Sequence, residues 1–111
     1  MSQKHWNSNE FNARLTQDTA WTNASLQASP GTGFRSYVTD IVIDCGATSR
    51  TFSLLDGSGG TVLFKFTPAA NTSVHAHLQV PLRLTAATAL CLTSSGASVG
   101  AFVGVNGFVA R

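Results

Sequence analysis

Two histidines, His75 and His77, are the side chains whose type and spacing come nearest to a chemical site. Residues two apart on a strand share a face, so both imidazoles could reach one metal ion. A zinc site needs a third and usually a fourth ligand, and the remaining histidine, His5, lies far away in the sequence. The pattern therefore favours a polar strand face without a metal. If that face lies near a symmetry axis, titration of His75 and His77 would make assembly sensitive to pH.

Asp40 and Asp44 are the carboxylates that most resemble an acid–base pair. Four residues of extended chain span roughly 13 Å, which exceeds the roughly 6.5–9.5 Å between the carboxyl groups of an inverting glycosidase. We interpret both as solvating charges on the outer face of a strand. The other acidic residues, Glu10, Asp18 and Asp56, form no cluster and no calcium loop. We therefore expect neither an enzyme nor a cofactor.

The two cysteines, Cys45 and Cys91, are predicted to be free thiols. Cys45 falls on the inward face of its predicted strand and Cys91 on the outward face of another, and side chains on opposed faces rarely reach the geometry of a disulfide. The first residues lack the apolar core of a secretion signal, which favours a reducing cytoplasm. The glycine-rich run at 57–60 precedes no helical pattern, so we do not interpret it as a phosphate-binding loop.

Length and composition restrict the classes of protein. A chain of 111 residues is long enough for one domain with one core. Charged residues make up 11% and hydrophobic residues 43%, in periodic runs, which excludes a disordered chain. The net charge of +2, with Lys and Arg scattered, argues against nucleic acid as a partner. No apolar run is long enough for a membrane helix, so we expect no membrane partner. A weakly charged chain rich in small residues suits packing against copies of itself or a partner.

The stretch 50–66 holds the clearest strand signal. Glycines within 56–60 separate two short runs of Phe, Leu, Val and Thr, which predicts a tight turn between antiparallel strands. In the second run Val62, Phe64 and Phe66 alternate with polar residues, as in a half-buried strand. An isolated hairpin is marginal in water, so further strands must cover this Phe face.

The rest of the chain supplies further strands and no helix. They are predicted at 21–26, 34–45, 74–80, 82–84, 89–93 and 99–109. In the second of them, Tyr37, Ile41 and Ile43 are placed together on the inward face. About eight short strands separated by turn residues indicate an all-β fold, a single-domain antiparallel β-sandwich. We predict a jelly roll of about eight strands, with an immunoglobulin-like sandwich as the alternative.

Residues 1–14 are predicted to form a flexible N-terminal arm, and residues 15–111 the sandwich domain. The arm is rich in Asn and Ser, whose side chains compete for backbone hydrogen bonds and oppose a long helix. Its two aromatic residues, Trp6 and Phe11, support a sharper hypothesis, because aromatic side chains are favoured as interface anchors. We predict that they contact a neighbouring subunit or a partner surface.

The last predicted strand, 99–109, has two apolar faces. One face carries the aliphatic side chains Val99, Ala101, Val103 and Val105, and the other carries Phe102 and Phe108 beside Gly100 and Gly104. A strand of a two-layer sandwich normally has one polar face. We therefore predict that the second face, with Gly100, Phe102, Gly104 and Phe108, is a subunit interface, where the glycines permit close approach of a second backbone. Coverage by the N-terminal arm is the alternative.

Five motifs follow one another along the chain: WTN at 21–23, YVTDI at 37–41, LDGSGGTV at 55–62, PLRL at 81–84 and GVNGFV at 104–109. From about residue 21 to the C-terminus, this series resembles small β-sandwich structural proteins of tailed bacteriophages. The resemblance implies a non-enzymatic virion component, foremost a capsid decoration (cement) protein made in the host bacterial cytoplasm. Such a protein is a homotrimer at symmetry points of the capsid surface, and its partners are its own copies and the major capsid protein.

A recognition module is the competing class, namely a receptor- or glycan-binding tip or head-fibre domain. Jelly rolls also serve as lectins, so the fold does not discriminate between the two classes. Aromatic side chains can stack on sugar rings, and four residues offer this: Trp21, Phe34, Tyr37 and Phe108. Core or interface packing explains each of them equally well. A gain in the heat resistance of capsids would favour decoration, and binding to host cells or glycans would favour recognition.

Overall fold

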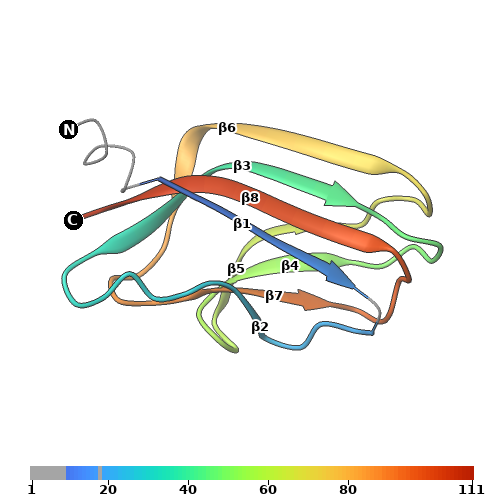
Figure 1. Ribbon diagram of the computed structural model, residues 1–111, viewed down its shortest axis with the longest axis horizontal. Coiled ribbons are helices and arrows are strands. Elements are labelled where there is room, and N and C mark those ends of the chain that lie inside the picture. The colour runs from blue at the N-terminus through green and yellow to red at the C-terminus, as the bar shows by residue number, and fades with distance from the viewer. Residues whose placement is uncertain (1–9, 18) are drawn as a thin grey trace, which may run out of the picture.

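The computed structural model describes residues 10–17 and 19–111, which form eight strands in two antiparallel sheets (Figure 1). The strands are β1 (Glu10–Gln17), β2 (Ala24–Gln27), β3 (Arg35–Asp44), β4 (Phe52–Asp56), β5 (Thr61–Phe66), β6 (Ser73–Arg83), β7 (Leu90–Ser94) and β8 (Ala101–Ala110). One sheet has the order β1-β8-β3-β6 and the other β2-β7-β4-β5. The described residues contain no helix long and apolar enough to cross a membrane.

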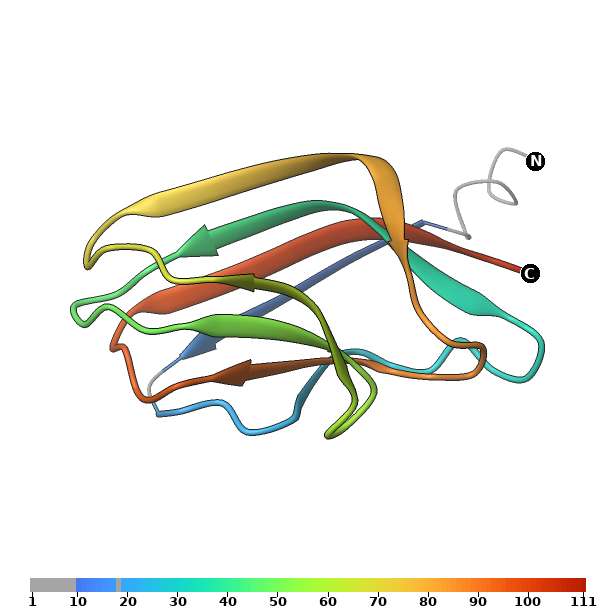
Figure 2. The same ribbon diagram turned by 180° about the vertical axis from the view of Figure 1, so that it is seen from behind.

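This strand order is that of a jelly roll. The chain passes from one sheet to the other at every connection except the β4–β5 hairpin, and the two sheets lie face to face as two layers (Figures 1 and 2). The edge strands β1 and β2 lie on one side of the sandwich, and the edge strands β6 and β5 lie on the other. The predicted antiparallel sandwich of jelly-roll type is therefore confirmed, in preference to the immunoglobulin-like order.

The core lies between the sheets and consists mainly of aliphatic side chains. Fully buried members come from both layers: Ile41, Ile43, Val103 and Val105 from one, and Phe52, Leu54, Leu90 and Leu92 from the other. The ring of Trp21 packs edge-on against Phe52, with centroids 6.0 Å apart. The recognition hypothesis included Trp21 among the rings that could stack on a sugar. Trp21 is only 8% exposed, so it cannot do so.

The predicted hairpin is confirmed as β4 and β5. Its turn needs glycine, because Gly57 and Gly59 have φ angles of +89° and +68°. A Cβ on Gly60 would lie 1.8 Å from the backbone oxygen of Asp56. The carboxylate of Asp56 also accepts hydrogen bonds from the backbone amide and the hydroxyl of Thr85, at 3.0 and 2.7 Å. These bonds fix the turn to the loop between β6 and β7.

The predicted arm at 1–14 is wrong for residues 10–14, which belong to β1. Phe11 and Ala13 point inward while Glu10, Asn12 and Arg14 point outward, and this alternation pairs β1 with β8 along its whole length. The Asn-rich composition concealed this period of two. The remaining residues of the predicted arm lie outside the described residues, and Trp6 is among them.

The predicted number of strands, about eight, agrees with the structure only because two errors cancel. The segments predicted separately at 74–80 and 82–84 form one strand, β6, and this merger offsets the unpredicted β1. Pro81 lies within residues 78–81 of β6, which pair with no residue of β3 because the register jumps from His77 to Leu82, so its missing amide donor removes no ladder hydrogen bond. The strand predicted at 21–26 begins only at Ala24.

A bulge in β3 changes the predicted inward face. The pairing of β3 with both β6 and β8 shifts between Val38 and Asp40, so the alternation before the shift is opposite to that after it. Ile41 and Ile43 are buried in the core as predicted. Tyr37, which was placed beside them, lies instead on the outer face, opposite Phe108 of β8.

The last strand, β8, lies inside its sheet, between β1 and β3. Ala101, Val103 and Val105 are buried as predicted. Two members of the predicted faces are wrong: Val99 and Gly100 precede the strand in a turn, where Gly100 has a φ of +84°. In the part of the chain that the structure describes, β1 lies beside β8 rather than over its outer face.

Candidate functional site

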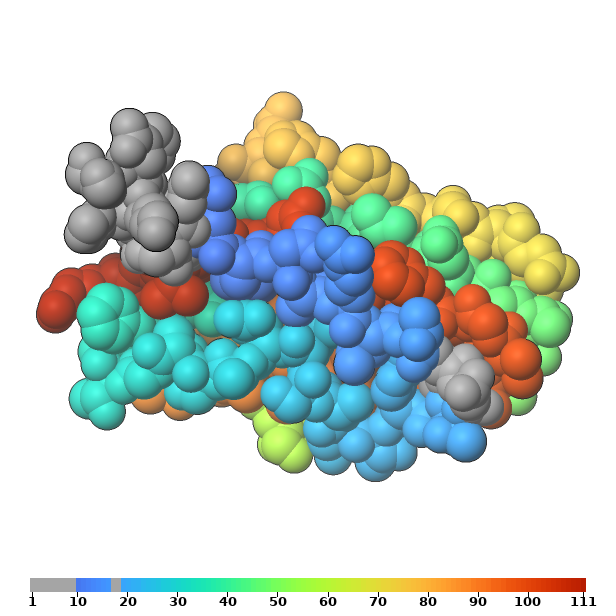
Figure 3. Space-filling view, viewed as in Figure 1, coloured from blue at the N-terminus to red at the C-terminus, as the bar shows by residue number. Residues whose placement is uncertain are grey.

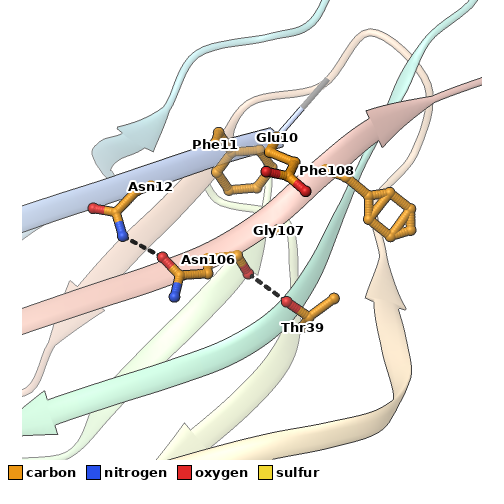
Figure 4. A pocket seen from close by; sticks show the side chains of 7 residues that line it. All are labelled: Glu10, Phe11, Asn12, Thr39, Asn106, Gly107 and Phe108. Carbon is orange, nitrogen blue, oxygen red and sulfur yellow. Dashed lines mark hydrogen bonds between the residues drawn. The ribbon is translucent and has the colours of Figure 1, made fainter. Parts of the chain in front are cut away.

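The outer face of the β1-β8-β3-β6 sheet carries two adjoining hollows along β8, which share Asn12 and Asn106. The first, of about 580 Å³, is also lined by Glu10, Thr39 and Phe108 (Figure 4). The second, of about 190 Å³, is lined in addition by Arg14, Asp40, Val42, Phe102 and Gly104. We call the two hollows together the outer furrow. The side chains of β1, β8, β3 and β6 cover this face in the space-filling view (Figure 3).

Hydrogen bonds between side chains hold the middle of the outer furrow. Arg14 Nε donates to Asn12 Oδ1 at 2.8 Å, and Asn12 Nδ2 donates to Asn106 Oδ1. Thr39 Oγ1 donates to the backbone oxygen of Asn106 at 3.2 Å (Figure 4). Each side-chain amide offers two N–H donors and one acceptor oxygen, so this chain fixes the amides in place without using all of their capacity.

An aromatic ring stands near each end of the outer furrow. At one end Phe108 stacks on Tyr37, with ring centroids 4.9 Å apart and planes 4° apart. At the other end the ring of Phe102 lies over Gly104, because a Cβ on Gly104 would be only 3.2 Å from Phe102 Cε2. Both phenylalanines and Tyr37 are half-buried. The furrow therefore has ring surface at its ends and polar groups between them.

Asp40, His75 and His77 lie side by side at the β6 border of this face. Asp40 Oδ1 lies 2.7 Å from His77 Nδ1, within hydrogen-bond distance, and 3.8 Å from His75 Nε2. The hydrogen bond with His77 is the main reason that the pKa of Asp40 lies below its usual value of 3.8. The two histidines share the outward face, as predicted. Within residues 10–17 and 19–111, no group of three or more His, Cys, Asp or Glu side chains could hold a metal ion.

The cysteines lie away from this face and are buried. Cys45 and Cys91 are free thiols. Burial raises the pKa of the Cys91 thiol. The hydroxyl of Ser98 lies 3.8 Å from Cys45 Sγ, and that sulfur donates to the backbone oxygen of Thr48 at 3.3 Å. These contacts are those of structural thiols packed in a core.

The structure brings some of the residues that the sequence singled out to the outer furrow, since Phe11 and Phe108 both line its first hollow, and places Phe34 elsewhere. Phe102, Gly104 and Phe108 lie together on the outer face, and their role in a subunit contact stays a prediction. Phe11 is half-buried against the core, opposite Gly107, rather than on a free arm. The ring of Phe34 lies apart from the furrow, with the guanidinium carbon of Arg111 4.9 Å from its centroid.

Sequence reasoning missed the polar members of the outer furrow: Glu10, Asn12, Thr39 and Asn106. They come from β1, β3 and β8, three strands that are adjacent only in the folded sheet. One of them could have been found from the sequence. Asn12 is polar and stands between the apolar Phe11 and Ala13, and this alternation predicts an outward-facing position of a strand.

A second surface lies where the edge strands β5 and β6 leave the sandwich open. β5 pairs only with β4, and β6 pairs only with β3. Three large apolar side chains of these strands are exposed: Val62 by 49%, Phe66 by 38% and Val80 by 81%. We call this surface, β5 and β6 with these exposed side chains, the open edge.

The single face predicted at Val62, Phe64 and Phe66 is wrong, because the pairing of β5 with β4 shifts between Phe64 and Val62. Phe64 and Phe66 lie opposite the buried Leu54 and Phe52, whereas Val62 lies opposite Leu55 and on the other face.

No protein-family model and no curated protein sequence matches this chain. Among solved structures, it is similar to a C-terminal family 22 carbohydrate-binding module of Clostridium thermocellum, with 16% identity, a TM-score of 0.49, and coverage of 92% of this chain and 85% of that one. It is also similar to the coat protein of Tobacco streak virus, with 11% identity, a TM-score of 0.42, and coverage of 87% and 86%. A third similar structure is a Bacillus endospore appendage protein, with 14% identity, a TM-score of 0.38, and coverage of 93% and 90%.

Proposed function

We propose that this chain is a non-enzymatic capsid decoration (cement) protein of a bacteriophage virion, which binds the assembled shell as a homotrimer. The observation that carries the proposal is the open edge. Exposed apolar side chains that gather on one surface mark contacts with other proteins. An unpaired strand edge adds main-chain donors and acceptors for a further strand. Val62, Phe66 and Val80 are exposed and belong to the two edge strands, β5 and β6, on the same side of the sandwich.

The open edge suits contact between copies. A contact between unlike surfaces of identical subunits closes into a ring when its rotation matches the symmetry, and three copies would close a trimer. Phe102, Gly104 and Phe108, the interface predicted from sequence, lie among the polar side chains of the outer furrow instead. We therefore assign the trimer contact to the open edge and leave the furrow exposed.

Shell stabilisation follows from where the trimer binds. A protein that binds the assembled shell and not its separated subunits stabilises the shell by mass action. Three linked copies bind several major capsid protein subunits at once, which raises the overall affinity far above that of one copy. Under this proposal the protein is made in the bacterial host and then binds the capsid surface.

The oligomeric state and shell binding test the proposal. Light scattering on the purified protein should give three times the protomer mass, and added protein should raise the temperature at which shells of the same virus break. Val80→Lys should dissociate the trimer, because it puts a charge on the open edge. Ser25→Lys is the matched control, since Ser25 is an exposed residue of β2, the edge strand on the other side of the sandwich. A monomer at all concentrations, or equal effects of both variants, would refute the assignment.

A recognition module is the second candidate function, and the outer furrow is the specific observation that favours it. Binding sites are concave surfaces with apolar area and a few fixed polar groups. The ring of Phe108 and the amides of Asn12 and Asn106 meet this description. Binding of the purified protein to intact host cells, lost on mutation of the furrow, would support this candidate.

A further inference from the structure

We propose that the outer furrow binds a neutral saccharide. The inference rests on the recognition function, since it names the ligand class of that same surface. It does not depend on shell attachment, which we assign to the open edge. Four properties of the furrow carry it: the pairing of its central strand, its charges, its rings and its amides.

The floor of the outer furrow offers no main-chain hydrogen bonds to a ligand. β8 runs along it and is paired with β1 on one side and with β3 on the other. A peptide that binds as an added strand needs a free strand edge. Recognition over β8 must therefore rely on side chains, which disfavours an extended peptide as the occupant.

The charges of the outer furrow disfavour an anionic ligand. Glu10 lines the first hollow and Asp40 the second, and Arg14 is the one cation that lines either of them. The low pKa of Asp40 means that it is ionised at neutral pH. Phosphate binding depends on clusters of Lys and Arg. Nucleic acids and acidic glycans would meet more negative than positive charge here.

The remaining groups match the two faces of a sugar. A pyranose ring combines apolar C–H surface with hydroxyls that both donate and accept hydrogen bonds. Tyr37 covers one side of the Phe108 ring, which leaves the other side for the apolar face of a sugar. Asn12 and Asn106 each provide donors and an acceptor, and Glu10, opposite Phe108 across the strands, provides acceptors.

Preorganisation supports the same assignment. The hydrogen bond between Asn12 and Asn106 and the one from Thr39 hold these groups before any ligand arrives. A ligand then loses less affinity to the ordering of side chains. In this arrangement Phe108 is the stacking residue of the first hollow, and the amides of Asn12 and Asn106 bind hydroxyls (Figure 4). Phe102 provides the ring of the second hollow.

Titration calorimetry with the full chain tests the inference. The probes are maltohexaose, mannohexaose and chitohexaose as neutral saccharides, hexagalacturonic acid as an acidic one, and a neutral decapeptide, after a screen on an array of bacterial surface glycans. We expect binding by at least one neutral saccharide. Phe108→Leu should weaken it by about tenfold or more, and Asn106→Ala by about fivefold. Phe108→Tyr should retain binding, because it keeps the ring.

Gln79→Ala is the matched control, because it removes a side-chain amide from the same sheet outside both hollows. Thermal unfolding shows whether each variant folds. If a furrow variant does not fold, Asn12→Ala is used in its place, because Asn12 is exposed and its truncation leaves the core unchanged. Binding restricted to acidic glycans or the peptide, no binding to any neutral glycan, or equal binding by the furrow variants and wild type would overturn the inference. The oligomeric mass of each furrow variant is measured as well. If saccharide binding fails while the mass stays that of the wild type, the saccharide inference fails and the proposed shell attachment does not.

Discussion

The outer furrow lies over β8, a strand paired on both sides, whereas the open edge consists of β5 and β6, each paired on one side only. The furrow presents two amides that already contact each other, Asn12 and Asn106, and the carboxylates of Glu10 and Asp40. The open edge presents aliphatic and aromatic side chains, of which Val80 is the most exposed. A strand inside a sheet can offer a partner only its side chains, while an edge strand offers its main chain as well.

This difference separates two kinds of binding within one small domain. Side chains in fixed positions select a ligand by the pattern of its polar groups. Apolar surface next to an unpaired edge favours association with little selection beyond shape, because burial of apolar area is not directional. A jelly roll in which both surfaces act could therefore assemble through one side and recognise through its outer face.

The largest expected effect compares Phe52 with Phe66, which face each other across β4 and β5. Phe52 is 1% exposed, so Phe52→Ala should lower the free energy of unfolding by about 3–5 kcal/mol in urea titrations. Phe66→Ala should cost about 1 kcal/mol in a dilute monomer, because its ring is already partly in water. If copies cover the open edge, the loss from Phe66→Ala must grow with protein concentration. A constant loss would contradict burial of this edge in an oligomer.

An intermediate effect distinguishes the two faces of β8 through Gly107 and Gly104. A Cβ on Gly107 would lie 1.9 Å from the backbone oxygen of Tyr37 and 2.8 Å from Phe11 Cζ, so Gly107→Ala should cost about 1–3 kcal/mol by overpacking. Gly104→Ala should change stability by no more than about 0.5 kcal/mol, because its Cβ is close only to the ring of Phe102, which can move, and lies at an ordinary contact distance of 3.9 Å from the backbone oxygen of Ala13. Thermal unfolding of both variants checks the order. Both variants should keep the oligomeric mass of the wild type, since neither residue lies on the open edge.

The smallest expected effect concerns Asp40 and His77 at the border of the furrow. The pKa of Asp40 is lowered in the folded protein, so its contribution to stability is present above pH 3.8 and is lost as the pH falls through the folded-state pKa. His77→Ala should raise the pKa of Asp40, measured by NMR titration of its carboxyl carbon. His75→Ala is the matched control and should raise it less, because His75 lies 3.8 Å away and makes no hydrogen bond. Equal shifts in both variants would refute the role of the His77 bond.

Local patterns predicted the parts of the fold that depend on neighbours in sequence. The turn at 56–60 follows from glycines that adopt positive φ angles, and the buried face of β8 follows from the alternation of Ala101, Val103 and Val105. β1 had the same alternation, but its outward residues are Asn, Glu and Arg in a segment whose composition suggested a flexible arm. The hydrophobic period was a better guide there than the composition.

The features that escaped prediction depend on contacts between distant segments. The bulge near Thr39 arises from pairing with β6 and β8 together, and no local signal in β3 requires it. It moves Tyr37 to the outer face and so creates the stack with Phe108. The bond between Asn12 and Asn106 joins residues 94 positions apart. A candidate site that combines such contacts can be assigned only once the register of three strands is known.

The place of β8 between β1 and β3 has a consequence for the order of events during synthesis. The ribosome releases the strand at 101–110 after all the others, although this strand occupies an interior slot of its sheet. Until it emerges, β1 and β3 have no partner between them, and the layer cannot close. We expect the β1-β8-β3-β6 sheet to close only after residues 101–110 have left the ribosome. Until then, the inward side chains of β1 and β3 lack the cover that β8 provides between them.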